Sequence, residues 1–220
     1  MSRSAFVTFL CMVPCLQAEE VIHHWQFTTE HIREGAVKPV VGNLAGKITS
    51  PVKFATTEPK ALLLPGDSKV QHCIEITSEL GKAELPTQAL TVEAWVWIDR
   101  LQPWGAVVGA FQDNGPYEKG WLLGYEQSRF FFAVSTKGKG RLTYLHAREH
   151  FQPGAWYHLV GTYDGKEMRV YVDGRLQARS TEQSGNIEYP PKGWFTVGAY
   201  QDNDEFYSMA GQLESVSIRN

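Results

Sequence analysis

Two acidic segments in the chain each follow a short apolar stretch that contains glycine. The first is residues 108–114 (VGAFQDN), and the second is residues 197–203 (VGAYQDN), which continues into Asp204 and Glu205. Calcium in proteins binds about six to eight oxygen atoms from carboxylates, amides and carbonyls, which such loops can supply. The alternative is that Asp and Asn end the strands by forming Asx turns. Calcium is therefore the one cofactor that the sequence suggests. Its predicted ligands are Asp113, Asn114, Asp202, Asn203, Asp204 and Glu205.

Aromatic residues lie close in sequence to both acidic segments. Trp104 and Tyr117 flank the first segment, and Phe206 and Tyr207 follow the second. An exposed ring can stack on the apolar face of a sugar while neighbouring Asp, Asn and Gln side chains bond its hydroxyls. We therefore expect these four aromatic residues to contact a ligand. Trp121 instead lies within a strand-like run, which favours packing in the core.

Residues 146–150 (HAREH) match the His-x-x-Glu-His pattern of inverted zinc peptidases. That chemistry requires a helix, because both histidines must share one face. The preceding residues 142–145 resemble a strand, and Gln152-Pro153-Gly154 would end a helix behind it. The pattern is therefore interpreted as the edge of a loop with two exposed histidines. Neither a Gly-x-Ser-x-Gly elbow nor a Walker loop occurs in the sequence.

The composition excludes some classes of function. The 220 residues include 21 Lys and Arg against 24 Asp and Glu, so the formal net charge of −3 argues against a nucleic-acid-binding protein. The 20 Gly, 11 Pro and 12% aromatic residues favour many strands and turns over a helical bundle.

The N-terminal segment has the pattern of a secretory signal peptide. Arg3 precedes an apolar run over residues 4–16, and a small residue, Ala18, precedes a polar stretch. The run is shorter than the roughly 20 apolar residues that span a bilayer, and no later segment is longer. We predict a signal peptide over residues 1–18, a domain over residues 19–220, no transmembrane segment, and a secreted or extracytoplasmic protein (periplasm or cell envelope, if bacterial). The alternatives are a buried N-terminal strand or a lipid anchor at Cys15, which Pro14 disfavours.

After that cleavage one cysteine, Cys73, would remain, so no internal disulfide is expected. Its alternating neighbours in residues 72–76 predict a strand and a buried thiol.

The hydrophobic pattern predicts strands almost throughout. Residues 90–98 (LTVEAWVWI) alternate, with Trp95 and Trp97 on a face that could pack a second layer. Residues 156–175 contain two Asp-Gly pairs, Asp164-Gly165 and Asp173-Gly174, which are typical of tight hairpin turns. Further strands are predicted over residues 21–27, 61–64, 106–111, 120–125, 129–135, 141–146, 194–200 and 210–218. Without a convincing helix, the pattern predicts an all-β fold of two antiparallel sheets, a sandwich or jelly roll.

The succession of LTVEAWVWID, PGAWYHLVGTYDGKEMRVYVDG, FTVGAY and MAGQLESVSIRN resembles a laminin-G-like, concanavalin A-like jelly-roll domain. The resemblance extends from about residue 21 to residue 220. It implies the fold but no single activity, because the superfamily includes lectins, receptor modules, accessory domains of glycan hydrolases and glucanases. Residues 212–215 (QLES) depart from the Asp-Glu pair that often follows the glycine of the family's last strand, which weakens a metal role there.

Glucanases of this superfamily place catalytic acids on alternate positions of one strand, beginning Glu-x-Asp, and here no Glu is followed two residues later by Asp. We therefore predict a secreted, non-catalytic module that binds a glycan or an extracellular or envelope protein with the assistance of calcium. The alternatives are an accessory or leading domain of a larger secreted hydrolase, a hydrolase with dispersed acids, and a scaffold for subunit contacts.

Overall fold

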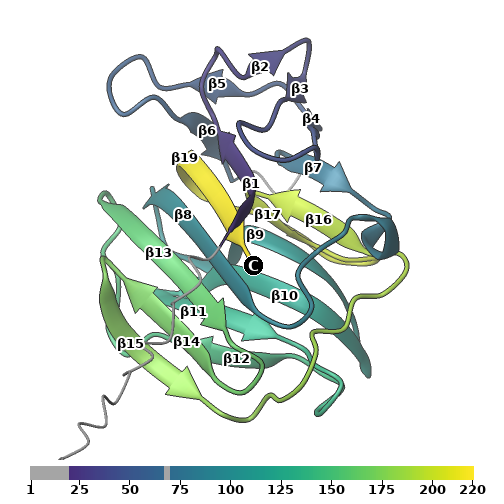
Figure 1. Cartoon of the computed structure of the whole chain (residues 1–220). Coiled ribbons are helices and arrows are strands. Elements are labelled where there is room, and N and C mark those ends of the chain that lie inside the picture. The colour runs from purple at the N-terminus through teal and green to yellow at the C-terminus, as the bar shows by residue number, and fades with distance from the viewer. Residues whose placement is uncertain (1–19, 67–69) are drawn as a thin grey trace, which may run out of the picture.

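The computed structural model describes residues 20–66 and 70–220, so the predicted signal peptide lies outside the described residues. The strands form two layers (Figure 1), and every strand pair is antiparallel. The predicted all-β, two-sheet antiparallel sandwich is confirmed.

The first sheet has the order β15-β14-β13-β8-β19-β6-β5, with β1 also paired to β19. Its strands are β1 (Val21–Gln26), β5 (Lys53–Phe54), β6 (Leu62–Pro65), β8 (Leu90–Ile98), β13 (Trp156–Tyr163), β14 (Met168–Val172), β15 (Arg175–Ser180) and β19 (Ala210–Arg219).

The second sheet has the order β12-β11-β10-β9-β16-β7-β4-β3-β2. Its strands are β2 (Ile32–Arg33), β3 (Ala36–Val37), β4 (Gly46–Ile48), β7 (Ile74–Thr77), β9 (Gln102–Asn114), β10 (Tyr117–Gln127), β11 (Arg129–Val134), β12 (Thr143–His146) and β16 (Trp194–Val197). A separate hairpin consists of β17 (Ala199–Gln201) and β18 (Phe206–Ser208). Within the described residues the single helical element is the 3₁₀ turn η1 (Leu80–Lys82), and no helix there could cross a membrane.

Strand β8 has the predicted bounds and the predicted alternation. Its inward side chains are buried, whereas Trp95 on the opposite face is 42% exposed. Trp95 stacks on His158 of β13, with ring centroids 5.0 Å apart. Within the described part of the chain, this face therefore packs against side chains of the neighbouring strand instead of the second layer that its pattern suggested.

The two Asp-Gly pairs form different turns. Asp173 and Gly174 have φ values of 50° and 73°, so they form the tight turn expected between β14 and β15. At Asp164-Gly165 only the glycine has a positive φ, and Asp164 Oδ1 accepts the N–H groups of Lys166 and Glu167. This loop of residues 164–167 therefore ends where β14 begins, at Met168.

The main core lies between the sheets. It contains fully buried aromatic side chains from both layers, including Trp25, Trp121, Tyr125 and Phe132. The predictions of a buried Trp121 and a buried Cys73 are both confirmed. Burial raises the pKa of the Cys73 thiol to about 11, so it remains protonated at neutral pH.

A second, smaller apolar cluster lies on the outer face of the second sheet. A bulge in β9 leaves Val107 and Val108 both in the main core, so the preceding Ala106 and the later Phe111 face outward. Tyr200 of β17 covers this cluster, with its ring centroid 4.8 Å from that of Phe111.

Gly198 allows the β17–β18 hairpin to fold over this face. Its φ is +84°, and a Cβ atom there would lie 2.4 Å from Leu64 Cδ1. The predicted strand over residues 194–200 is therefore interrupted at Gly198, because only glycine accommodates this conformation and this contact.

Candidate functional site

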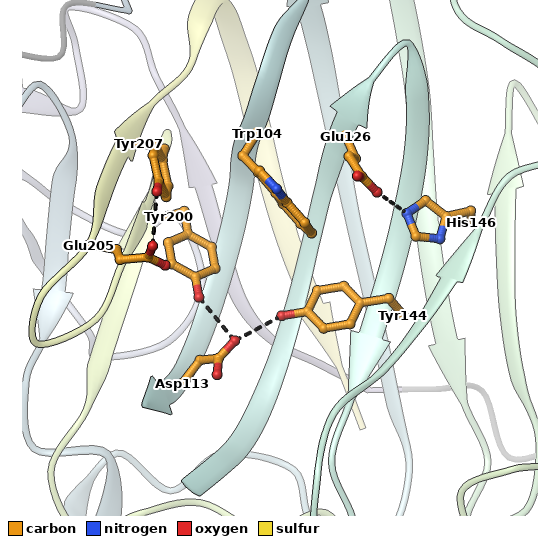
Figure 2. A pocket seen from close by; sticks show the side chains of 8 residues that line it. All are labelled: Trp104, Asp113, Glu126, Tyr144, His146, Tyr200, Glu205 and Tyr207. Atoms are coloured by element: carbon orange, nitrogen blue, oxygen red, sulfur yellow. Dashed lines mark hydrogen bonds and ion pairs between the residues drawn. The ribbon is translucent and has the colours of Figure 1, made fainter. Parts of the chain in front are cut away.

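A cleft of about 430 Å³ lies on the outer face of the second sheet, with the β17–β18 hairpin as one wall. Figure 2 shows side chains from β9, β10, β12 and the hairpin that point toward it. The lining residues are Trp104, Asp113, Glu126, Tyr144, His146, Tyr200, Glu205 and Tyr207.

Asp113 is held by two tyrosine hydroxyls. Its Oδ2 atom accepts hydrogen bonds from Tyr144 Oη at 3.1 Å and from Tyr200 Oη at 3.0 Å (Figure 2). Burial, followed by the negative charge of Asp113, raises the pKa of Tyr144. Burial, followed by Tyr144 and Asp113, also raises the pKa of Tyr200. Both hydroxyls therefore stay protonated at neutral pH, and they fix the carboxylate as donors.

The other two carboxylates of the cleft are oriented in the same way. Glu126 Oε2 lies 2.9 Å from His146 Nε2, and Tyr207 Oη donates to Glu205 Oε1 at 3.0 Å. In each of the three carboxylates, Asp113 included, one oxygen has a side-chain partner, and the second has none among the described residues. The second oxygens are therefore available as acceptors for a ligand.

The cleft is strongly acidic. Of the described residues that line it, none is Lys or Arg, and His146 is the one base. Burial raises the pKa of Asp202 beside the cleft. The backbone N–H groups of Asp204 and Glu205 oppose this rise, and the negative charges of the same two residues add to it. Burial and the charge of Asp113 likewise raise the pKa of Glu118.

The structure brings the two acidic segments together, because Asn114 Nδ2 donates a hydrogen bond to Asp204 Oδ1. Asp202 is only 5% exposed, and its Oδ1 atom accepts the N–H groups of Asp204 at 3.0 Å and of Glu205 at 2.7 Å. This is the Asx turn that the sequence left open as an alternative. Across residues 20–66 and 70–220, no three His, Cys, Asp or Glu side chains are grouped so as to hold a metal ion. The six calcium ligands stay a prediction.

Two of the four predicted aromatic residues, Trp104 and Tyr207, line the cleft. Tyr117 is 42% exposed and lies in a separate depression that Asn114 and Asn203 also line. Phe206 is half-buried on β18 and is not a lining residue.

Sequence reasoning missed Glu126, Tyr144, His146 and Tyr200 as members of the site. Tyr144 and His146 occupy alternate positions of β12, and they pair with the outward-facing residues Ala133 and Phe131. The alternation of strand residues could therefore have indicated from sequence that Tyr144 and His146 share a face. Nothing in the sequence indicates that β12 lies close enough to β9 for Tyr144 to reach Asp113.

The HAREH segment is not helical. His146 belongs to β12 and bonds Glu126, whereas His150 lies beyond the strand. The Nδ1 atom of His150 is 2.6 Å from Ser128 Oγ, and its Nε2 atom accepts a hydrogen bond from Arg129 Nε. The prediction that these histidines do not share a helix is confirmed, but the predicted loop edge with two exposed histidines is wrong for His146, which is half-buried in β12; only His150 is exposed beyond the strand.

Residues 74–220 match the family model of the concanavalin A-like lectin/glucanases superfamily. The chain belongs to this superfamily. It is also 33% identical over 118 residues to pappalysin-1 from Mus musculus and, over the same length, to pappalysin-1 from Homo sapiens. Each match covers 49% of this chain and 7% of the relative, so the chain spans a small part of those proteins.

Solved structures share the fold at low sequence identity. Domain 4 of AbnA, an extracellular arabinanase from Geobacillus stearothermophilus solved with arabinotriose, superposes with a TM-score of 0.61 at 17% identity, covering 92% of this chain and 93% of that one. A Ruminococcus gnavus IT-sialidase CBM40 bound to alpha2,3 sialyllactose gives 0.58 at 10% identity, over 72% and 88%. The binding domain of botulinum neurotoxin serotype G gives 0.61 at 12% identity, over 90% and 47%.

Proposed function

We propose that the chain is a secreted, non-catalytic carbohydrate-binding module and that its glycan occupies the acidic cleft. The observation that carries the proposal is Asp113, which is fixed by the hydroxyls of Tyr144 and Tyr200 beside the half-exposed rings of Trp104 and Tyr207. A sugar presents an apolar C–H face and a rim of hydroxyls, so rings and fixed acceptors on one surface match both.

Three further points support this proposal. The cleft volume of about 430 Å³ falls in the range of about 300–1,000 Å³ that is typical of small-ligand sites. Two of the similar folds were solved with oligosaccharides, one neutral (arabinotriose) and one sialylated. The signal-like N-terminal segment and the extracellular arabinanase both support a location outside the cell.

A second candidate function is a hydrolase with dispersed acids. It is favoured by the three carboxylates that surround the cleft from different elements, Asp113, Glu126 and Glu205. We prefer the non-catalytic function because the Glu-x-Asp pattern of the superfamily's glucanases is absent from the sequence.

The test is a glycan array with the purified secreted chain, followed by calorimetric titration of the glycans that bind. Trp104→Ala should weaken binding at least tenfold, and Tyr144→Phe should weaken it several-fold because it removes one donor to Asp113 but keeps the ring. Tyr117→Ala, outside the cleft, is the matched control.

Equal binding by the cleft variants and the wild type would refute the site, and absence of any glycan ligand would refute the function. Release of reducing ends from a bound glycan, lost in Glu126→Gln, would establish the hydrolase instead. Titrations in EDTA and in calcium test the predicted cofactor at the same time.

A further inference from the structure

We propose that Asp113, Glu126 and Glu205 make the cleft selective by ligand charge, so that affinity falls from amino sugars through neutral sugars to acidic ones. The inference rests on the proposed function, and it names the class of glycan that this cleft takes.

The first step concerns hydrogen-bond polarity. An ionised carboxylate accepts and cannot donate. Each of the three carboxylates has one oxygen held by a neighbour, and its second oxygen has no side-chain partner among the described residues. The cleft therefore offers hydrogen-bond acceptors to the hydroxyl or ammonium groups of a ligand. A carboxylate or sulfate group on a glycan is itself an acceptor, so it could not form hydrogen bonds with these oxygens.

The second step concerns charge compensation. Some acids outside the cleft have cationic partners: Arg219 lies 2.9 Å from Glu93, and Lys119 lies 3.0 Å from Glu188. In the cleft the one such partner is His146, which neutralises Glu126 only when it is protonated. The carboxylates of Asp113 and Glu205 have tyrosine hydroxyls as partners, which orient a charge without cancelling it.

The third step concerns the surroundings. Asp202 and Asp204 belong to the turn that joins β17 to β18, and Asp202 Oδ2 is 3.4 Å from the Tyr200 hydroxyl. A ligand in the cleft therefore experiences these negative charges as well. The half-exposed rings of Trp104 and Tyr207 add to the preference for a positively charged ligand, because the face of an aromatic ring attracts a cation. An acidic sugar would bring a like charge into a partly desolvated site, which costs affinity.

The experiment compares glycans of one backbone that differ in charge. Soluble β-1,4-linked oligomers of glucosamine, glucose and glucuronic acid would be titrated against the secreted chain, beside an array that holds neutral, amino and acidic glycans of other linkages. At low salt we expect the affinity for amino and neutral glycans to be at least about tenfold higher than the affinity for acidic ones. This difference in affinity should become smaller at about 1 M salt, where charges are screened beyond about 3 Å.

The double variant Glu126→Gln/Glu205→Gln removes two charges, and at each position an amide NH2 group can replace the ligand-facing acceptor oxygen while the other oxygen keeps its protein partner. It should improve the affinity for acidic glycans about tenfold relative to the affinity for neutral ones. Glu93→Gln, on the opposite sheet, makes the same chemical change outside the cleft and should leave the ranking as in the wild type. Preference of the wild type for acidic glycans, or an unchanged ranking in the double variant, would overturn the inference.

A second readout separates this inference from the proposed function. Each ion's quenching constant would be divided by its value for free tryptophan. The normalised quenching of the fluorescence component that Trp104→Phe removes should be stronger for caesium than for iodide, and the double variant should reduce that ratio. Equal quenching by the two ions would refute the charge selectivity even if no glycan bound, whereas absence of glycan binding alone would refute only the proposed function.

Discussion

The two outer faces of the sandwich carry similar side chains but differ as binding surfaces. On the first sheet, Glu93 lies beside the Trp95–His158 stack, 2.9 Å from Arg219 and 3.4 Å from His158. On the second sheet, Asp113 lies beside Trp104, Tyr144 and Tyr200 and has hydroxyls as partners. Both faces therefore combine aromatic rings with a carboxylate.

The two faces differ in how their carboxylates are paired and in whether the surface is concave. Burial alone would raise the pKa of Glu93, but Arg219 and His158 hold it below its usual value, so that carboxylate already has the Arg219 guanidinium as its partner. The second face keeps its charges and is hollowed by the β17–β18 hairpin. Aromatic and acidic composition thus does not make a site. The proposed site depends instead on a carboxylate without an Arg or Lys partner in a concave wall.

Removing the hairpin wall should produce the largest effect. Gly198→Val places a branched side chain at a φ of +84° and a Cβ atom 2.4 Å from Leu64. Backbone strain and overpacking together should lower the free energy of unfolding by about 3 kcal/mol and abolish glycan binding. Urea unfolding and calorimetry measure both quantities. Wild-type affinity in this variant would mean that the hairpin does not form the binding wall.

Matched tryptophan substitutions should separate the two faces. Trp104→Ala should cost about 2 kcal/mol of binding free energy, whereas Trp95→Ala should leave affinity unchanged despite its greater exposure. The same titrations serve for both variants, and circular dichroism controls for folding. Comparable losses in the two variants would contradict the assignment of the cleft to the second sheet.

Asp202 should destabilise the protein at neutral pH, because its raised pKa means that folding favours its protonated form. Asp202→Asn keeps the acceptor of the Asx turn but removes the charge, so it should raise the free energy of unfolding at pH 7. This gain should shrink as the pH falls through the raised pKa, and it should vanish below about pH 4, where the wild-type carboxyl is protonated in both states.

Asp202→Ala is the control, because it removes the charge and the turn acceptor together. It should be about 1 kcal/mol less stable than Asp202→Asn. Stability curves of the three proteins between pH 3 and pH 7 check both expectations. If calcium binds on these loops, its stabilising effect should be lost in both variants.

Glu93 should show the opposite sign and the smallest effect. Its lowered pKa means that folding favours the charged form, so its contribution is present above the unfolded pKa and is lost as the pH falls through the folded pKa. Glu93→Gln should therefore cost about 0.5–1 kcal/mol at pH 7 and almost nothing at pH 3. A loss that grew toward low pH would contradict the pairing with Arg219.

Local pattern alone determined several parts of this protein. The alternation of residues 90–98 gave β8 with its buried face, and Asp173-Gly174 gave a tight turn, because period and positive φ are properties of neighbouring residues. The two acidic segments, and Trp104 and Tyr207 close to them, could also be chosen from sequence, because their residue types and their closeness along the chain are local properties.

Tertiary structure decided which of these residues form a site. Asp113 is 31 residues from Tyr144 and 87 from Tyr200, and its partners follow from strand order, from the β9 bulge and from the turn at Gly198. A strand's period shows which side chains share a face, but it carries no information about which strand lies beside it. For that reason Tyr144, Tyr200, Glu126 and His146 became visible only in the folded chain, and Asp202 proved to be part of a turn.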